Sequence, residues 1–256
     1  MDVNTLLSAE PSVERVVTVA RVALSQRTPH HECPSYFAAL NAALREEPPP
    51  FGTKAYSDIF RDASANGQWM AISLMTNAER EGDGATRLWS LAACSSDEEE
   101  KQLLKRHAVD ESSHALAYLA LLDLSFPGAV APSFRAELKK LSPGYSMGLD
   151  LFIVDGSPYA RPPTVDDYVQ MNIAEIRTTI HHIMQRAALA THCSADAWPR
   201  AAKVLDSLLR DELSHVAYTA ELIERKANGE LTRLFCKRLG DFNRITDKEL
   251  GQKIFV

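Results

Sequence analysis

Apolar residues recur every three or four positions along most of this chain, which is the spacing of amphipathic helices. The segments with this spacing are residues 9–27, 34–46, 54–93, 96–124 and 195–228, together with a stretch that begins at Thr164. The chain has 256 residues, 45% of them apolar, which is enough to bury one large core. The pattern therefore predicts a single all-α domain.

Prolines and glycines mark the boundaries between the predicted helices. The expected parts of the domain 1–256 are an N-terminal helical extension (1–50), a first helix pair (54–124), a crossover (125–163) and a second pair (164–228). The crossover is long enough for short helices at 133–141 and 147–154. One or two short helices after residue 229 are expected to cover a bundle end. Gly82 and Gly84 weaken the helix predicted at 54–93, so a break in it would fall near them.

Two of the predicted helices carry nearly the same sequence, Asp-Glu-x-Ser-His, at residues 110–114 and 211–215. Side chains three positions apart on a helix share a face, with about 5–6 Å between their Cβ atoms. Glu111 with His114, and Glu212 with His215, can therefore each present a carboxylate and an imidazole to a divalent metal ion. A two-metal centre in a four-helix bundle needs two such helices and one glutamate from each of two others.

Candidates for the two further glutamates stand on the remaining long helices. Glu175 is the only carboxylate between Asp167 and Asp196. The first helix offers two, Glu79 and Glu81. Helical phase favours Glu81, which shares a face with the apolar positions of its helix, whereas Glu79 shares one with polar positions.

The predicted metal ligands are four carboxylates and two imidazoles: Glu81, Glu111, His114, Glu175, Glu212 and His215. Burying four carboxylates with two neutral histidines costs several kcal/mol per ion. Two divalent cations would balance the four negative charges. An oxygen-rich ligand set with one imidazole per metal suits two iron ions, with manganese or a mixed pair as the alternative.

At these residues the chain resembles the ferritin-like di-iron carboxylate superfamily, which includes ribonucleotide reductase small subunits, bacterial multicomponent monooxygenases, rubrerythrin-like proteins and arylamine N-oxygenases. The resemblance covers roughly residues 65–125 and 163–228. It implies a ferritin-like four-helix bundle with additional N-terminal, crossover and C-terminal helices, and it suggests a homodimer. In that superfamily an Asp before the ligand Glu often hydrogen-bonds a ligand histidine, which suggests this role for Asp110 and Asp211.

The resemblance also points to residues with catalytic roles. Thr179, one turn after Glu175, is similar to a threonine of the multicomponent monooxygenases and favours oxygen activation over iron storage. A helical threonine that bonds its own backbone is the alternative. Tyr118, one turn after His114, is a candidate for proton delivery or radical formation, against the alternative of a buried packing tyrosine.

Two further histidines share the faces of the predicted ligands. His107 lies four residues before Glu111, and His182 lies seven residues after Glu175. The N-oxygenases are similar in having an extra histidine one turn before a ligand glutamate, although in the second helix pair. Each histidine is an additional ligand candidate, and an ordinary partly buried histidine is the alternative.

Composition limits the partners and cofactors. The net charge of −6 gives no sign of a nucleic-acid or anionic-membrane surface. The N-terminus lacks the features of a secretory signal and no long apolar run occurs, so a cytoplasmic location is expected. The four cysteines are widely spread and are expected to be free thiols. No Gly-rich phosphate loop or dinucleotide fingerprint is present, so electrons are expected from an external donor, a ferredoxin or a flavin reductase.

Three functions are compatible with these residues. The favoured one is an O2-activating non-haem di-iron oxygenase or oxidase of specialised metabolism, which hydroxylates, N-oxygenates or otherwise oxidises a small organic substrate. The second is a rubrerythrin- or ferritin-like peroxidase or iron-handling protein, or a di-iron tRNA hydroxylase. The third is a metal-free helical binding protein whose Glu-x-x-His pairs lie on solvated faces.

Overall fold

The computed structural model describes residue 6 and residues 10–29, 31–146 and 156–251, and this part of the chain is helical without strands. The all-α prediction is confirmed. The helices are α2 (Glu14–Ser25), α3 (Pro34–Glu46), the 3-10 helix η1 (Pro50–Gly52), α4 (Lys54–Ser64), α5 (Gly67–Cys94), α6 (Glu98–Ser125), α7 (Pro132–Leu138), the 3-10 helix η2 (Lys139–Leu141), α8 (Pro143–Ser146), α9 (Val165–His192), α10 (Trp198–Arg225) and α11 (Leu231–Gly251).

The chain divides into two compact units. The first unit comprises Met1–Ser64, Thr164–Ala187 and Leu209–Val256, and the second comprises Ala65–Pro163 and Ala188–Leu208. The long helices α9 and α10 are therefore shared, each giving one part of its length to each unit.

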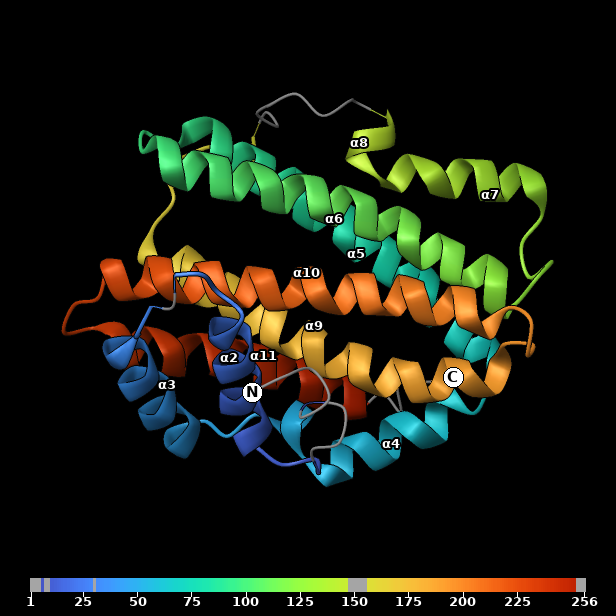
Figure 1. The fold of residues 1–256 in the computed structure, drawn as a ribbon, viewed down its shortest axis with the longest axis horizontal. Helices are drawn as coiled ribbons and strands as arrows, with labels where there is room; N and C mark the ends of the chain where they lie inside the picture. The colour runs from blue at the N-terminus through green and yellow to red at the C-terminus, as the bar shows by residue number, and fades with distance from the viewer. Residues whose placement is uncertain (1–5, 7–9, 30, 147–155, 252–256) are drawn as a thin grey trace. The chain divides into compact units, whose positions relative to one another are not determined.

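In the second unit, α5 and α6 lie side by side (Figure 1). Each is preceded by a residue whose side chain caps it. The Asn66 side chain accepts hydrogen bonds from the backbone N–H groups of Gln68 and Trp69, and the Asp97 carboxylate accepts one from the N–H of Glu100 at 2.9 Å. These bonds satisfy helical donors that have no partner within the helix, so they fix where α5 and α6 start.

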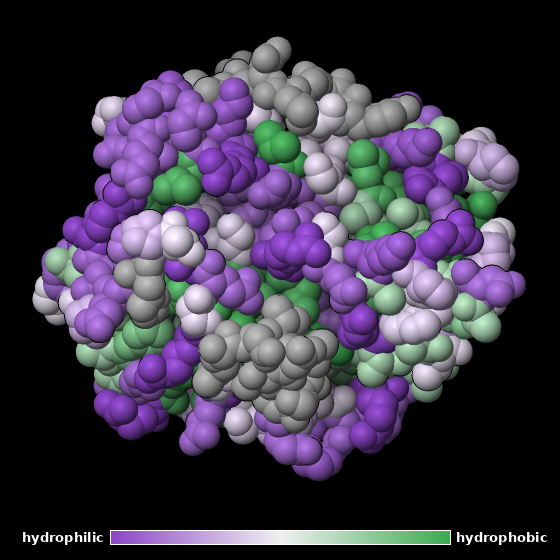
Figure 2. Space-filling view, viewed as in Figure 1, coloured by the Kyte–Doolittle hydropathy of each residue, from purple (hydrophilic) through white to green (hydrophobic). Residues whose placement is uncertain are grey.

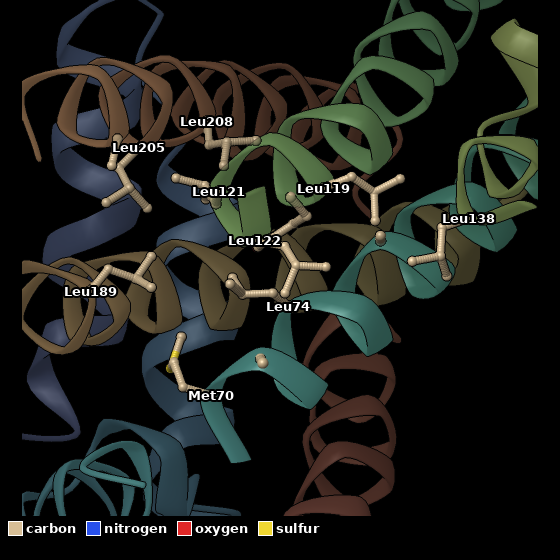
Figure 3. Packing of buried hydrophobic residues seen from close by; sticks show 13 residues of the cluster. Met70, Leu74, Leu119, Leu121, Leu122, Leu138, Leu189, Leu205 and Leu208 are labelled. Carbon is tan, nitrogen blue, oxygen red and sulfur yellow. The ribbon is translucent and has the colours of Figure 1, made fainter. Parts of the chain in front are cut away.

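The core of the second unit is built from five helical segments. Apolar side chains of α5 and α6 pack with Leu138 at the end of α7, the last turn of α9 and the first half of α10 (Figure 3). The members labelled in the figure are Met70, Leu74, Leu119, Leu121, Leu122, Leu138, Leu189, Leu205 and Leu208. Burying such a side chain contributes about 1.5–3 kcal/mol, so this core holds the five segments together.

The helix predicted at 54–93 is two helices, α4 and α5, and they are separated at residues 65–66. The prediction that a break would fall near the glycines was wrong. Because Asn66 caps α5 and Gly67 follows it, the chain restarts a helix there. Gly82 instead lies where the crossover backbone approaches α5 so closely that a Cβ atom would overlap the Leu141 carbonyl oxygen.

The crossover contains the short helices α7, η2 and α8, so the helix predicted at 133–141 is present as α7 followed by η2. The η2 turn contacts both α5 and α6, and α8 contacts α6 (Figure 1). The buried hydroxyl of Ser142 donates a hydrogen bond of 2.6 Å to the backbone carbonyl of Ser112 on α6. The helix predicted at 147–154 lies outside the described residues.

In the first unit, α11 packs on α3. Its 21 residues form one long helix, so the prediction of short helices capping a bundle end was wrong. Ion pairs join α11 to Asp166, near the start of α9. The Asp166 carboxylate accepts bonds of 2.7 and 2.8 Å from the Arg238 guanidinium and one of 2.8 Å from Lys237.

The helical stretch predicted to begin at Thr164 is α9, which starts at Val165. The N–H and hydroxyl of Thr164 donate bonds of 2.7 and 2.6 Å to the Asp167 carboxylate. Helix α9 is also tied to α3 and α10 by a buried network. The Tyr36 hydroxyl donates to Asn172 Oδ1 at 2.9 Å, and Asn172 Nδ2 donates to the Val216 carbonyl and to Thr219 Oγ1, both at 3.0 Å.

The face shown in Figure 2 is mainly hydrophilic, with apolar side chains in small separate areas. Among the described residues, no helix combines the length and the apolar character needed to cross a membrane. The described cysteines, Cys33, Cys94, Cys193 and Cys236, are free thiols, as predicted.

Candidate metal centre

The α6 copy of the motif presents one carboxylate flanked by two imidazoles. Glu111 Oε1 lies 3.4 Å from His114 Nδ1 and 3.4 Å from His107 Nε2. These three side chains are buried, with 6%, 2% and 1% of their surface exposed. Helix α6 places them together because positions 107, 111 and 114 follow one another at one-turn spacing on its inner face.

Helix α5 adds a second carboxylate to this group. Glu81 Oε2 lies 4.0 Å from His114 Nδ1, and the ligand atoms of Glu81, Glu111 and His114 all lie within 4.8 Å of one another. Helical phase predicted that the side chain of Glu81 faces inward. Only 9% of the surface of Glu81 is exposed, whereas Glu79 is exposed. We call these four residues, Glu81, His107, Glu111 and His114, the α6 half-site.

The electrostatics of the α6 half-site favour a charged Glu111. Burial by itself would raise the pKa of this carboxyl group. Hydrogen bonding with Glu81, His107 and His114 outweighs burial and holds the pKa of Glu111 well below its usual range. The half-site thus keeps a carboxylate anion in the interior, where it can bind a cation.

The α10 copy of the motif repeats the same geometry in the first unit. Glu212 Oε2 lies 3.4 Å from His215 Nδ1, and these side chains are 0% and 2% exposed. Glu175 of α9 is 8% exposed, and its carboxylate lies within 4.8 Å of an imidazole nitrogen of His215. We call Glu175, Glu212 and His215 the α10 half-site.

These buried glutamates and histidines form groups that could hold a metal ion. The members of such groups are Glu81, His107, Glu111, His114, Glu175, Glu212 and His215. Carboxylates and imidazoles without a thiolate suit iron or manganese. The burial of the carboxylates also fits a metal site, because a buried anion needs a compensating cation.

The other predicted site residues lie on the same helices. Thr179, on α9, is fully buried, and its hydroxyl has no hydrogen-bond partner among the described residues. His182 is 2% exposed. Tyr118 is 1% exposed and belongs to the apolar core of the second unit, which favours the packing alternative. Asp110 and Asp211 are partly buried, and their role as partners of the ligand imidazoles stays a prediction.

Sequence reasoning missed two features that support the half-sites. In the α10 half-site, Thr219 Oγ1 donates to the backbone carbonyl of His215 at 2.6 Å and joins this residue to the Asn172 network. In the α6 half-site, Gly84 of α5 faces Glu111 Oε2. The signal for Gly84 was its presence inside a helical pattern, which we interpreted as a break rather than as a close approach.

Comparisons with known proteins found no relative. No protein-family model, no curated protein and no solved structure matches this chain.

Proposed function

We propose that this protein is a non-haem oxygenase or oxidase that uses O2 and two iron ions to oxidise a small organic substrate. In this proposal α5, α6, α9 and α10 form a ferritin-like four-helix bundle, and the two half-sites make one dinuclear centre. The proposed ligands are Glu81, Glu111, His114, Glu175, Glu212 and His215, with His107 as an additional imidazole.

The repeated geometry of the two motif copies carries the proposal. Both Glu-x-x-His pairs place a carboxylate oxygen 3.4 Å from an imidazole Nδ1, and all four side chains are almost fully buried. Glu-x-x-His pairs on solvated faces would be exposed, so their burial disfavours the metal-free alternative. Two identical buried pairs are what a centre with two similar metal positions requires.

The residues present fit two divalent ions. Four buried carboxylates carry a charge that two divalent cations neutralise, and the nitrogen and oxygen donors match iron. Iron bound there would supply the capacity to activate O2 for hydroxylation, N-oxygenation or a related oxidation. The burial of the proposed ligand side chains would limit the access of water to the reacting groups.

Thr179 is the residue we propose for proton handling. It lies one turn after Glu175, it is fully buried, and its hydroxyl is not used by another described residue. A hydroxyl group can both donate and accept a hydrogen bond, so it can hold a proton near the Glu175 carboxylate and pass it on. Reducing electrons would come from a separate protein donor.

Metal analysis tests the ligand assignment. Protein produced with iron should contain about two irons per chain, and Glu111→Ala and Glu212→Ala should each lose at least one. Glu79→Ala is the matched control, because this exposed glutamate lies on α5 two residues from Glu81. Full loading of the Glu111→Ala protein would show that the assignment is wrong.

A second measurement tests whether the half-sites share one centre. Manganese-loaded protein should give the electron paramagnetic resonance spectrum of two magnetically coupled ions. Two uncoupled ions would show that the half-sites bind separately. Rapid O2 consumption by the reduced iron protein, with oxidation of a small amine, acid or aldehyde, would support the oxygenase. Iron uptake without substrate oxidation would favour iron handling instead.

A further inference from the structure

The two oxygens of the Glu111 carboxylate face different surroundings. Oε1 lies 3.4 Å from His107 Nε2 and 3.4 Å from His114 Nδ1. Oε2 is turned toward α5, where a Cβ atom added at Gly84 would lie 3.3 Å from it. Among the residues that the structure describes, no other heavy atom lies within 4 Å of that Cβ position outside the local α5 backbone and the residues that adjoin Gly84. Gly84 therefore leaves a space that the carboxylate itself borders.

The distance between α5 and α6 at this level is fixed by the crossover. A Cβ at Gly82 would overlap the Leu141 carbonyl oxygen and lie 3.0 Å from its carbonyl carbon. This close approach brings the following residue, Ser142, to α6, where its hydroxyl bonds the Ser112 carbonyl at 2.6 Å. The crossover thus contacts α5 beside Glu81 and α6 beside Glu111. The two helices cannot separate at this point without breaking a buried contact.

From this arrangement we infer that Gly84 is a positioning residue for Glu111. Because the crossover holds α5 and α6 in place, a methyl group at position 84 must be accommodated by the carboxylate. The glycine keeps Oε2 against α5 and leaves Oε1 directed at the two imidazoles. The consequence for metal binding rests on the proposed function, whereas the consequence for the carboxylate position does not.

The test uses Gly84→Ala in the full-length protein, first without metal. Alanine is favoured over glycine inside a helix, so the variant should fold and melt within about 5 °C of the parent. Its crystal structure should show Glu111 Oε2 shifted by a few tenths of an ångström, with the α5 backbone in place. An unmoved carboxylate, or α5 displaced from α6, would overturn the inference.

The second readout is the binding of Mn²⁺, with no other metal present, measured by titration and by the electron paramagnetic resonance spectrum. Gly84→Ala should bind Mn²⁺ about 10- to 100-fold more weakly, the range seen when groups that orient a ligand are changed. Its spectrum should also change, which a role in folding alone would not produce. Unchanged affinity and spectrum in a protein whose parent binds Mn²⁺ would refute the inference while leaving the proposed function standing.

Gly240→Ala is the matched control. Gly240 lies inside α11, and a Cβ there would be 3.7 Å from the Glu47 carboxylate, which is an ordinary contact distance. This variant makes the same chemical change in a helix beside a carboxylate, without crowding, and should bind Mn²⁺ like the parent. If the parent binds no Mn²⁺, the proposed function fails, and the metal-free structure of Gly84→Ala still decides whether Gly84 positions Glu111.

Discussion

The network of Tyr36, Asn172 and Thr219 predicts a specific pattern of stability changes. All three side chains are fully buried, and Asn172 accepts from Tyr36 while it donates to α10. Burial raises the pKa of Tyr36 well above its usual value, so its hydroxyl stays a neutral donor. Tyr36→Phe removes that donor and leaves Asn172 Oδ1 buried without its partner.

The cost follows from the unsatisfied acceptor. A buried polar group left without a hydrogen bond costs about 1–3 kcal/mol, against a total stability of about 5–15 kcal/mol for a folded protein. Replacing both partners by apolar groups of similar shape is nearly neutral. We therefore expect Tyr36→Phe and Asn172→Leu each to destabilise the protein. The loss of unfolding free energy in the double variant should be smaller than the sum of the two single losses by about 1–2 kcal/mol, which is the coupling energy of the pair.

Urea denaturation of the parent, both single variants and the double variant measures this coupling. Tyr56→Phe is the matched control, because the Tyr56 hydroxyl bonds His181 Nε2 at 2.8 Å in a site only partly buried. Water can replace that bond, so the control should cost less than about 1 kcal/mol. Strictly additive costs for Tyr36 and Asn172 would refute the reasoning that their hydrogen bond stabilises the fold.

Three further results are expected. The hydrogen bonds and charges of Arg238 and Lys237 outweigh the effect of burial and lower the pKa of Asp166. The ion pairs of Asp166 therefore stabilise the fold fully above the unfolded pKa of about 3.9, and this stabilisation is lost as the pH falls through the folded pKa. Melting temperatures between pH 6 and pH 3 should therefore fall more steeply for the parent than for Asp166→Asn. Burial, aided by nearby glutamates, raises the pKa of Cys33 to about 11, so a thiol reagent at pH 8 should label it only after unfolding. Chelation of bound metal should lower the free energy of unfolding by about 3 kcal/mol if the free metal concentration before chelation was 100 times the Kd.

The sequence predicted several helix boundaries well because their patterns are local. Helix α3 begins and ends where the apolar spacing does, at Pro34 and Glu46, and Thr164 with Asp167 marked the start of α9. The inward face of Glu81 also followed from helical phase alone. These features depend on residues within a turn or two of one another, which a sequence displays directly.

The errors concern contacts between distant segments. Gly82 and Gly84 weaken an isolated helix, yet α5 continues through both because each borders another part of the fold, the Leu141 carbonyl and the Glu111 carboxylate. One or two short helices were expected after residue 229, whereas α11 is a single helix, and nothing local showed that its Arg238 would pair with Asp166. Such contacts join residues separated by more than twenty positions, so no spacing rule could reveal them.

The two half-sites show why the motif alone does not define a metal centre. The ligand pairs share one geometry, but the residues that support them differ. Glu111 lies between two imidazoles and beside Gly84, whereas the backbone of His215 accepts a hydrogen bond from Thr219 of the buried network. Residues that orient ligands change metal affinity by about 10- to 100-fold. Two positions that share the same Glu-x-x-His pair but differ in the residues around it should therefore bind metal with unequal affinity, and that inequality comes from residues outside the repeated sequence.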